Sequence, residues 1–216
     1  MTGDVCSACS SLRATAWIGL WLQSLLMNDR LPKGVHAAQA RATEAGFPLS
    51  CEPGVGRFLA ALAAGVPPGG RVLEIGTGVG VGTAWLVHGI DGRQDIELIS
   101  VELDPATAAI ARRGDWPRYV TLRQGNVLDL FDQLGTFDLI FADAQGGKWE
   151  RLDRTIGALC PGGMVVVDDM TPPVWLDDLH RRKTAEVRAQ LFSHADLVAA
   201  ELAEASGMIL ATRRRG

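Results

Sequence analysis

A glycine-rich turn is the first stretch of the sequence with an evident chemical use. Residues 76–80 read GTGVG, follow the apolar segment RVLEI and precede a stretch of helical character. Glycines at the start of a helix expose backbone N–H groups and suit a bound phosphate. Glu74 argues against phosphate, because a carboxylate in the same turn repels an anion. The turn is therefore expected to hold a ligand that presents a cation or sugar hydroxyls.

Further polar residues follow the next two apolar segments. The dinucleotide pattern GxGxxG is not met, because Val81 stands where its last glycine would be when counted from Gly76. Glu102 ends the segment ELISVE, where a carboxylate can accept hydrogen bonds from both hydroxyls of a ribose. Asn126 follows the third segment, where its amide could meet an adenine edge or only form part of a turn. These residues fit an adenosine-containing ligand other than a dinucleotide.

The elements that must position these residues alternate along the chain from residue 70 onward, as is typical of parallel strands joined by crossover helices. Strands are predicted near residues 71–76, 96–102, 119–123, 137–142 and 163–168. Helices are predicted near residues 80–90, 105–113, 127–134, 149–160 and 175–192. Segments 197–202 and 208–212 are predicted to form a terminal β-hairpin, with an antiparallel strand at one edge of the sheet.

The N-terminal part of the sequence is helical in pattern, near residues 11–29, 35–45 and 54–64. Trp17, Trp21 and Leu25 recur every four residues and form an apolar stripe that is costly to leave in water. We therefore predict a helical extension over residues 1–49, which acts as a lid or as the seam of a homodimer. Residues 50–216 are predicted to form the ligand-binding domain.

Together, the glycine turn, Glu102 and Asn126 resemble the class I methyltransferases that use S-adenosylmethionine (SAM). The resemblance covers residues 50–212 and implies a Rossmann-like α/β fold with a mostly parallel seven-stranded sheet, helices on both faces and a terminal antiparallel hairpin. The ligand's sulfonium and ammonium groups also account for Glu74. The cofactor contacts that the resemblance implies are Glu74, Gly76, Thr77, Gly78, Gly80, Thr83, Glu102, Leu103, Asn126, Val127 and Asp143.

A narrower resemblance is to the small-molecule O-methyltransferases related to catechol and caffeoyl-CoA O-methyltransferases. The stretches VLEIGTGVGVGTAWL, ISVELDP, FDLIFADAQGGKWE and PGGMVVVDDM carry it. The family's metal-binding Asp and Asp-Asn pair correspond to Asp143, Asp168 and Asp169, the last of which stands where Asn is usual. Three carboxylates suit Mg²⁺ or another divalent cation, which would bind the acceptor oxygen and lower the pKa of its hydroxyl. The resemblance thus implies an optional metal cofactor.

The same comparison singles out candidates near the reacting atoms. The family often has a Lys three positions after the metal-binding Asp. Here Gly146 stands at that position and the nearest amine is on Lys148, so Asp143 and Lys148 are the candidate catalytic residues. Trp149 and Trp175 follow the fourth and fifth strands and could form an aromatic wall for a flat acceptor or pack in the core.

Composition excludes several classes of protein. The 216 residues carry a net charge of −4 and no basic stripe, which makes a nucleic-acid partner unlikely. Residues 14–27 are too short and too interrupted to span a bilayer, and they lack the flanks of a signal peptide. Four cysteines at unrelated spacings indicate no disulfide framework, which favours the cytoplasm. Cys6 and Cys9 form a lone CxxC pair, for which a disordered N-terminus is favoured over zinc.

The hypothesis from the sequence is a cytoplasmic SAM-dependent O-methyltransferase of a small, aromatic molecule, with a divalent cation as an optional aid. One alternative is a metal-independent N- or C-methyltransferase of a small molecule. Another is a non-catalytic cofactor-binding protein that docks a partner through its N-terminal stripe. A nicotinamide-dependent oxidoreductase is disfavoured, because the glycine spacing is wrong and no Tyr-x-x-x-Lys pair is present.

Overall fold

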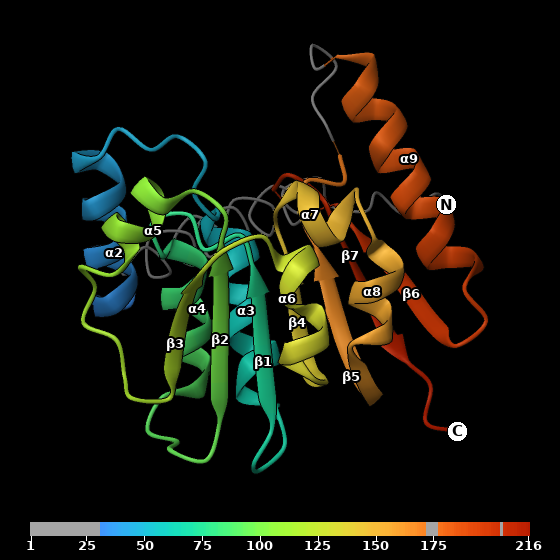
Figure 1. Ribbon diagram of the computed structural model, residues 1–216, viewed down its shortest axis with the longest axis horizontal. Helices are drawn as coiled ribbons and strands as arrows, with labels where there is room; N and C mark the ends of the chain where they lie inside the picture. The colour runs from blue at the N-terminus through green and yellow to red at the C-terminus, as the bar shows by residue number, and fades with distance from the viewer. Residues whose placement is uncertain (1–30, 172–176, 204) are drawn as a thin grey trace, which may run out of the picture. The chain divides into compact units, whose positions relative to one another are not determined.

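The apolar segments assemble into a seven-stranded sheet in the computed structural model, which describes residues 31–171, 177–203 and 205–216. The strand order is β3-β2-β1-β4-β5-β7-β6 (Figure 1). The strands are β1 (Arg71–Ile75), β2 (Glu97–Glu102), β3 (Val120–Gln124), β4 (Phe137–Ala142), β5 (Leu159–Val167), β6 (Leu197–Leu202) and β7 (Met208–Arg213). The first five strands pair in parallel, whereas β7 runs antiparallel to both β5 and β6. The predicted fold class, with its terminal antiparallel hairpin, is confirmed.

Helices connect the parallel strands and cover the sheet. They are α2 (Lys33–Glu44), α3 (Pro53–Ala64), α4 (Val81–Ile90), α5 (Pro105–Ala111), α6 (Val127–Leu134), α7 (Gln145–Lys148), α8 (Leu152–Gly157) and α9 (Asp178–Ser193). In Figure 1, α6 and α8 lie in front of the sheet and α3 and α4 behind it. Helices on both faces bury the parallel strands on both sides, which explains their nearly continuous apolar sequences.

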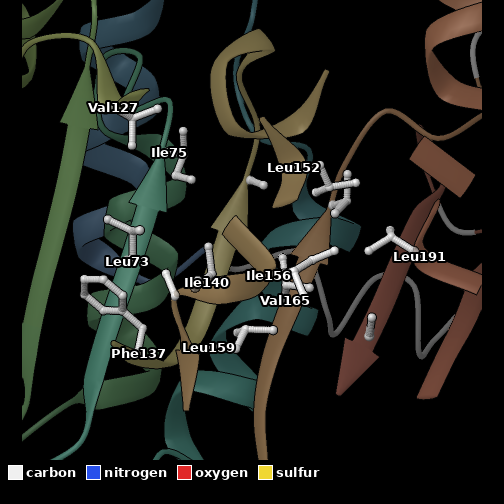
Figure 2. Close-up of a cluster of buried hydrophobic side chains, with 14 of the residues drawn as sticks. Leu73, Ile75, Val127, Phe137, Ile140, Leu152, Ile156, Leu159, Val165 and Leu191 are labelled. Atoms are coloured by element: carbon white, nitrogen blue, oxygen red, sulfur yellow. The ribbon is translucent and has the colours of Figure 1, made fainter. Parts of the chain in front are cut away.

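The alternation of side chains along β1 shows how the core is divided between the two faces. Leu73 and Ile75 join a cluster in which α6, α8 and α9 pack on the front of the sheet (Figure 2). Glu74 points the other way, where Thr83 of α4 hydrogen-bonds to it. A strand therefore delivers one polar side chain to the α4 side while its neighbours remain in the apolar core.

One predicted helix is wrong in its bounds. The helix predicted near residues 149–160 is shorter, because α8 ends at Gly157 and β5 begins at Leu159. Pairing between β4 and β5 shifts register after the Phe137–Leu159 pair, and Gly162 lies within the shifted stretch at φ 84°. The glycine-containing irregularity lets β5 begin before the predicted residue 163, because it absorbs extra residues without ending the pairing.

The N-terminal predictions fall largely outside the described residues. These include the helix near 11–29, its apolar stripe, and the Cys6 and Cys9 pair. Residues 34–216 form one compact unit, which includes α2. The division into an extension over 1–49 and a domain over 50–216 stays a prediction.

Close approach of α3 and α4 on the back of the sheet generates a stability prediction. A Cβ atom at Gly89 in α4 would stand 2.1 Å from the carbonyl oxygen of Ala60 in α3. Gly89→Ala is therefore expected to lower the free energy of unfolding by about 1–3 kcal/mol, measured by urea denaturation. The control is Gly157→Ala at the end of α8, where a Cβ meets nothing within 4 Å. Equal stability of the two variants would contradict the packing described.

Candidate active site

A pocket of about 720 Å³ lies at the carboxyl ends of the parallel strands. The sheet order reverses beside β1, since the chain proceeds from β1 to β2 and β3 on one side and to β4 and β5 on the other. Loops that follow adjacent strands diverge at such a point and leave a crevice, where ligands of open α/β sheets bind. The loops after all five parallel strands line this pocket, and residues 47–52 between α2 and α3 add a further wall.

The glycine turn forms the wall next to β1. Gly76, Gly78 and Gly80 all have positive φ, which other residues seldom adopt. A Cβ atom at Gly76 would stand 2.6 Å from the carbonyl oxygen of Asp143, so the turn packs directly on the backbone that follows β4. The N–H groups of Gly76 and Thr77 both donate to the carbonyl oxygen of Val101 in β2. The turn is thereby held against both neighbours of β1.

Glu102 connects this turn to the end of β2. One carboxylate oxygen accepts from the N–H of Gly78 at 2.8 Å, and the other accepts from the N–H of Asp104 at 3.0 Å. Leu103 beside it is 65% exposed and lines the pocket. A carboxylate oxygen accepts more than one hydrogen bond, so Glu102 can hold the turn and still bind ligand hydroxyls.

Glu74 is fully buried beneath the first turn of α4. Its Oε2 accepts hydrogen bonds from the hydroxyls of Thr83 and Ser100, and Gly82 leaves room for its Oε1, which lacks a partner in the described structure. Burial raises the pKa of Glu74 to about 7. The N-terminus of α4 carries the positive end of the helix dipole, which stabilises a carboxylate at this position. Glu74 therefore shapes the turn from below.

Asn126 and Val127 line the side of the pocket that faces β3. Asn126 caps α6, because its Oδ1 accepts from the N–H of Leu128 at 3.0 Å. The cap fixes the orientation of the amide at the rim of the pocket. Asn126 can therefore cap α6 and contact a ligand at the same time.

Acidic residues form the end of the pocket near β4 and β5. Asp143, Asp168 and Asp169, the three residues that the family resemblance singled out, all line it. Burial raises the pKa of Asp143 well above its ordinary value and also raises that of Asp168. Asp168 Oδ1 accepts from the Ser206 hydroxyl at 2.7 Å and from the N–H of Asp169 at 2.8 Å.

Lys148 lies behind these acids rather than in the lining. Its side chain is 5% exposed, and its Nζ is 3.8 Å from Asp143 Oδ1 and 3.5 Å from Asp169 Oδ2. Nζ also donates to the backbone carbonyl of Asp168 at 3.3 Å. The amine therefore contacts acids from two strand ends, and it does not face the pocket as a base would.

The predicted divalent cation does not fit the acids as they are arranged. The carboxylates of Asp143 and Asp169 turn to the Lys148 ammonium, while that of Asp168 turns to Ser206. Within the described ranges, no three His, Cys, Asp or Glu side chains gather as ligands for a metal ion. Mg²⁺ needs several oxygen ligands in near-ideal octahedral geometry, and here Asp168 Oδ1 and Asp169 Oδ2 already accept hydrogen bonds while Asp143 Oδ1 faces the Lys148 ammonium.

Residues 73–170 match the methyltransferase domain family. Over 138 residues the chain is 32% identical to "Probable O-methyltransferase Rv1220c" of Mycobacterium tuberculosis, a match that covers 60% of each chain. The match spans about three fifths of the length of the curated relatives.

Two solved structures share the whole fold. The cofactor-bound protein Rv0187 from MTB has a TM-score of 0.78 at 25% identity, over 90% of this chain and 97% of that one. The O-methyltransferase TomG from Streptomyces achromogenes, in complex with SAM, has a TM-score of 0.73 at 24% identity, over 91% and 96%. Residues 73–170 are therefore similar to a methyltransferase domain in sequence, and the sheet order agrees with that similarity. No helix in the described parts is long and apolar enough to cross a membrane.

Most of the predicted cofactor residues line one pocket. Gly80 and Thr83 are the exceptions. A Cβ atom at Gly80 would stand 2.7 Å from the Trp116 ring, and Thr83 supports Glu74. Those in the lining are Glu74, Gly76, Thr77, Gly78, Glu102, Leu103, Asn126, Val127 and Asp143.

The pocket also has lining residues that the sequence did not predict. Phe47 approaches Gly78 from the linker between α2 and α3, and Ser206 reaches Asp168 from the β6–β7 turn. Neither is near the glycine turn in sequence, and neither lies in a recognisable motif. Trp149 packs edge-on against His180 at 4.7 Å between ring centroids, outside the pocket lining, and Trp175 is not among the described residues.

Burial of Glu74 makes the stability of the fold depend on pH. Its folded pKa of about 7 exceeds its ordinary value of 4.5, so between these values the folded chain keeps a proton that the unfolded chain loses. Glu74 is therefore expected to lower stability as pH rises through this window, by on the order of 3 kcal/mol in total. Glu74→Gln should gain in stability relative to the parent from pH 4.5 to pH 8, as measured by denaturation of ligand-free protein.

The control for this measurement is Glu97→Gln, which removes an exposed carboxylate from the other end of β2. It should leave the pH dependence of the parent nearly unchanged in this window. A constant difference between the parent and Glu74→Gln across the same pH range would mean that Glu74 does not titrate as described.

Proposed function

We propose that the chain is a SAM-dependent O-methyltransferase of a small, hydroxylated aromatic molecule. The observation that carries this proposal is the hydrogen bond from the Gly78 N–H to Glu102, which holds the glycine turn and the acid at one switch-point pocket. The O-methyltransferase names of the relatives and the SAM bound to TomG support the same activity.

The described residues fit SAM. Gly76 and Gly78 leave the turn without side chains, and Glu102 has carboxylate oxygens to accept ribose hydroxyls. Asn126, Val127 and Leu103 form the rim for the base. When bound, SAM supplies an electrophilic methyl group on a sulfonium, whose positive charge suits this acidic pocket.

The contribution of the protein to methyl transfer is alignment and removal of a proton. With SAM bound, Asp143 would take the acceptor's proton while the methyl group passes from sulfur to the acceptor oxygen. Asp143 lines the pocket between the glycine turn and the acidic end, so both reactants lie within its reach. Its raised pKa makes the carboxylate a stronger base. Positioning of the two reactants supplies most of the remaining acceleration.

The charge of the pocket restricts the acceptor. Its described lining has no Lys, Arg or His side chain. Phosphorylated acceptors, including CoA thioesters, are expected to be poor because the field would repel them. Phe47 and Leu49 supply apolar surface, which suits a small ring. The carboxylates in this lining are Glu52, Glu74, Glu102, Asp104, Asp143, Glu150, Asp168 and Asp169.

The homodimer and the cytoplasmic location are also proposals. The apolar stripe of Trp17, Trp21 and Leu25 supports a subunit interface, and the cysteine spacing supports a reducing compartment. Light scattering of the full chain tests the homodimer, since a monomer at micromolar concentration would contradict it.

Calorimetry with SAM is the primary test of this function. Glu102→Ala is expected to raise the Kd for SAM at least about tenfold, because it removes ribose contacts and releases the Gly78 N–H. The matched control is Glu97→Ala at the opposite end of β2, which should bind SAM as the parent does. Mass spectrometry of catechol-type acceptors incubated with SAM then tests transfer. A parent chain that binds no SAM would refute the proposal.

A further inference from the structure

The chain carries its own cation at the place where the resemblance calls for a metal. Lys148 Nζ lies between the carboxylates of Asp143 and Asp169, at 3.8 and 3.5 Å, and bonds to the Asp168 carbonyl at 3.3 Å. These are the three residues that would otherwise hold the divalent ion. We propose that Lys148 is the resident cation of this acidic cluster and that methyl transfer needs no divalent metal. This inference rests on the proposed function for its catalytic part.

The backbone before Lys148 places the amine there. Gly146 and Gly147 depart from helical geometry inside α7, and Gly147 has φ 83°. A Cβ atom at Gly147 would stand 2.9 Å from Ile75 Cδ1, and the Thr155 hydroxyl donates to the Gly147 carbonyl at 2.7 Å. The glycine pair thus turns the chain tightly against β1 and α8. Lys148 consequently reaches the acids from behind the pocket.

Burial makes this ion pairing necessary for the lysine. The Lys148 side chain is almost fully buried, and an unpaired ammonium in that position would be strongly disfavoured. Asp143 and Asp169 supply the compensating charges, and the Trp149 ring lies 6.0 Å from Nζ. Removal of the two acids would leave the buried Lys148 ammonium without compensation.

A divalent ion would compete with the ammonium for the same oxygens. Bound to Asp143 and Asp169, it would stand beside the buried positive charge of Lys148, and like charges at short range repel. Asp168 contributes mainly its other carboxylate oxygen, because its Oδ1 already accepts from Ser206 and from the Asp169 N–H. Lys148 is therefore a positioning residue that orients Asp143 and Asp169 at the pocket.

The test combines metal binding with variants of the lysine. In the parent, calorimetry with MgCl₂ should show no saturable binding into the millimolar range, and EDTA should leave turnover of the acceptor unchanged. Lys148→Met removes the ammonium and leaves the carboxylates of Asp143 and Asp169 without a cation between them. We expect turnover to fall at least about tenfold, as when a buried charge pair is broken. Mg²⁺ should also raise the Tm of this variant, which a purely structural role of Lys148 does not predict.

The matched control is Lys183→Met in α9, where the lysine pairs with Glu186 on the surface. It should behave as the parent does in both measurements. Saturable Mg²⁺ binding by the parent, or turnover that EDTA abolishes and Mg²⁺ restores, would overturn the inference. So would a Lys148→Met variant that matches Lys183→Met in turnover and in its response to Mg²⁺.

If Lys148→Met does not fold, Mg²⁺ binding and the EDTA response of the parent still decide the question. If the parent binds no SAM, the proposed function fails, but Mg²⁺ calorimetry still tests whether the acids bind a metal.

Discussion

The turn after β1 has no room for a side chain at position 76, and both halves of the pocket depend on this constraint. A Cβ atom there would stand 2.6 Å from the Asp143 carbonyl, so the glycine turn rests directly on the backbone that follows β4. The Asp143 N–H donates to the Ile75 carbonyl and completes the contact. Displacement of this turn would therefore move the cofactor wall and the acidic end together.

Electrostatic balance is the second organising feature. Negative charge is concentrated at the strand ends and is compensated in different ways at each position. Glu74 has hydroxyl donors and a raised pKa, Glu102 accepts backbone N–H groups, and Asp143 and Asp169 share one ammonium. Each arrangement reduces the cost of burying a carboxylate. The remaining negative field suits a positively charged sulfonium.

Much of the fold and half of the site could be predicted because they depend on local sequence pattern. Periodicity predicts the parallel strands and places Glu102 at the end of one of them, whereas the family resemblance implies Asp143 and Asp168, and parallel pairing brings all three to one edge. Phe47 and Ser206 could not be predicted in this way, because long-range packing brings them to the site. The orientation of Lys148 was likewise hidden, because it depends on the backbone angles of Gly146 and Gly147.

A cation carried by the chain differs in kind from one acquired from solution. Lys148 contributes a single positive charge from behind the acids, whereas a metal in the pocket would contact the acceptor oxygen itself. An ammonium in this position can orient Asp143 but cannot polarise the acceptor directly. Methyl transfer on this chain would then rely on alignment and on Asp143 as base, which favours acceptors whose hydroxyl already ionises readily, as phenols do.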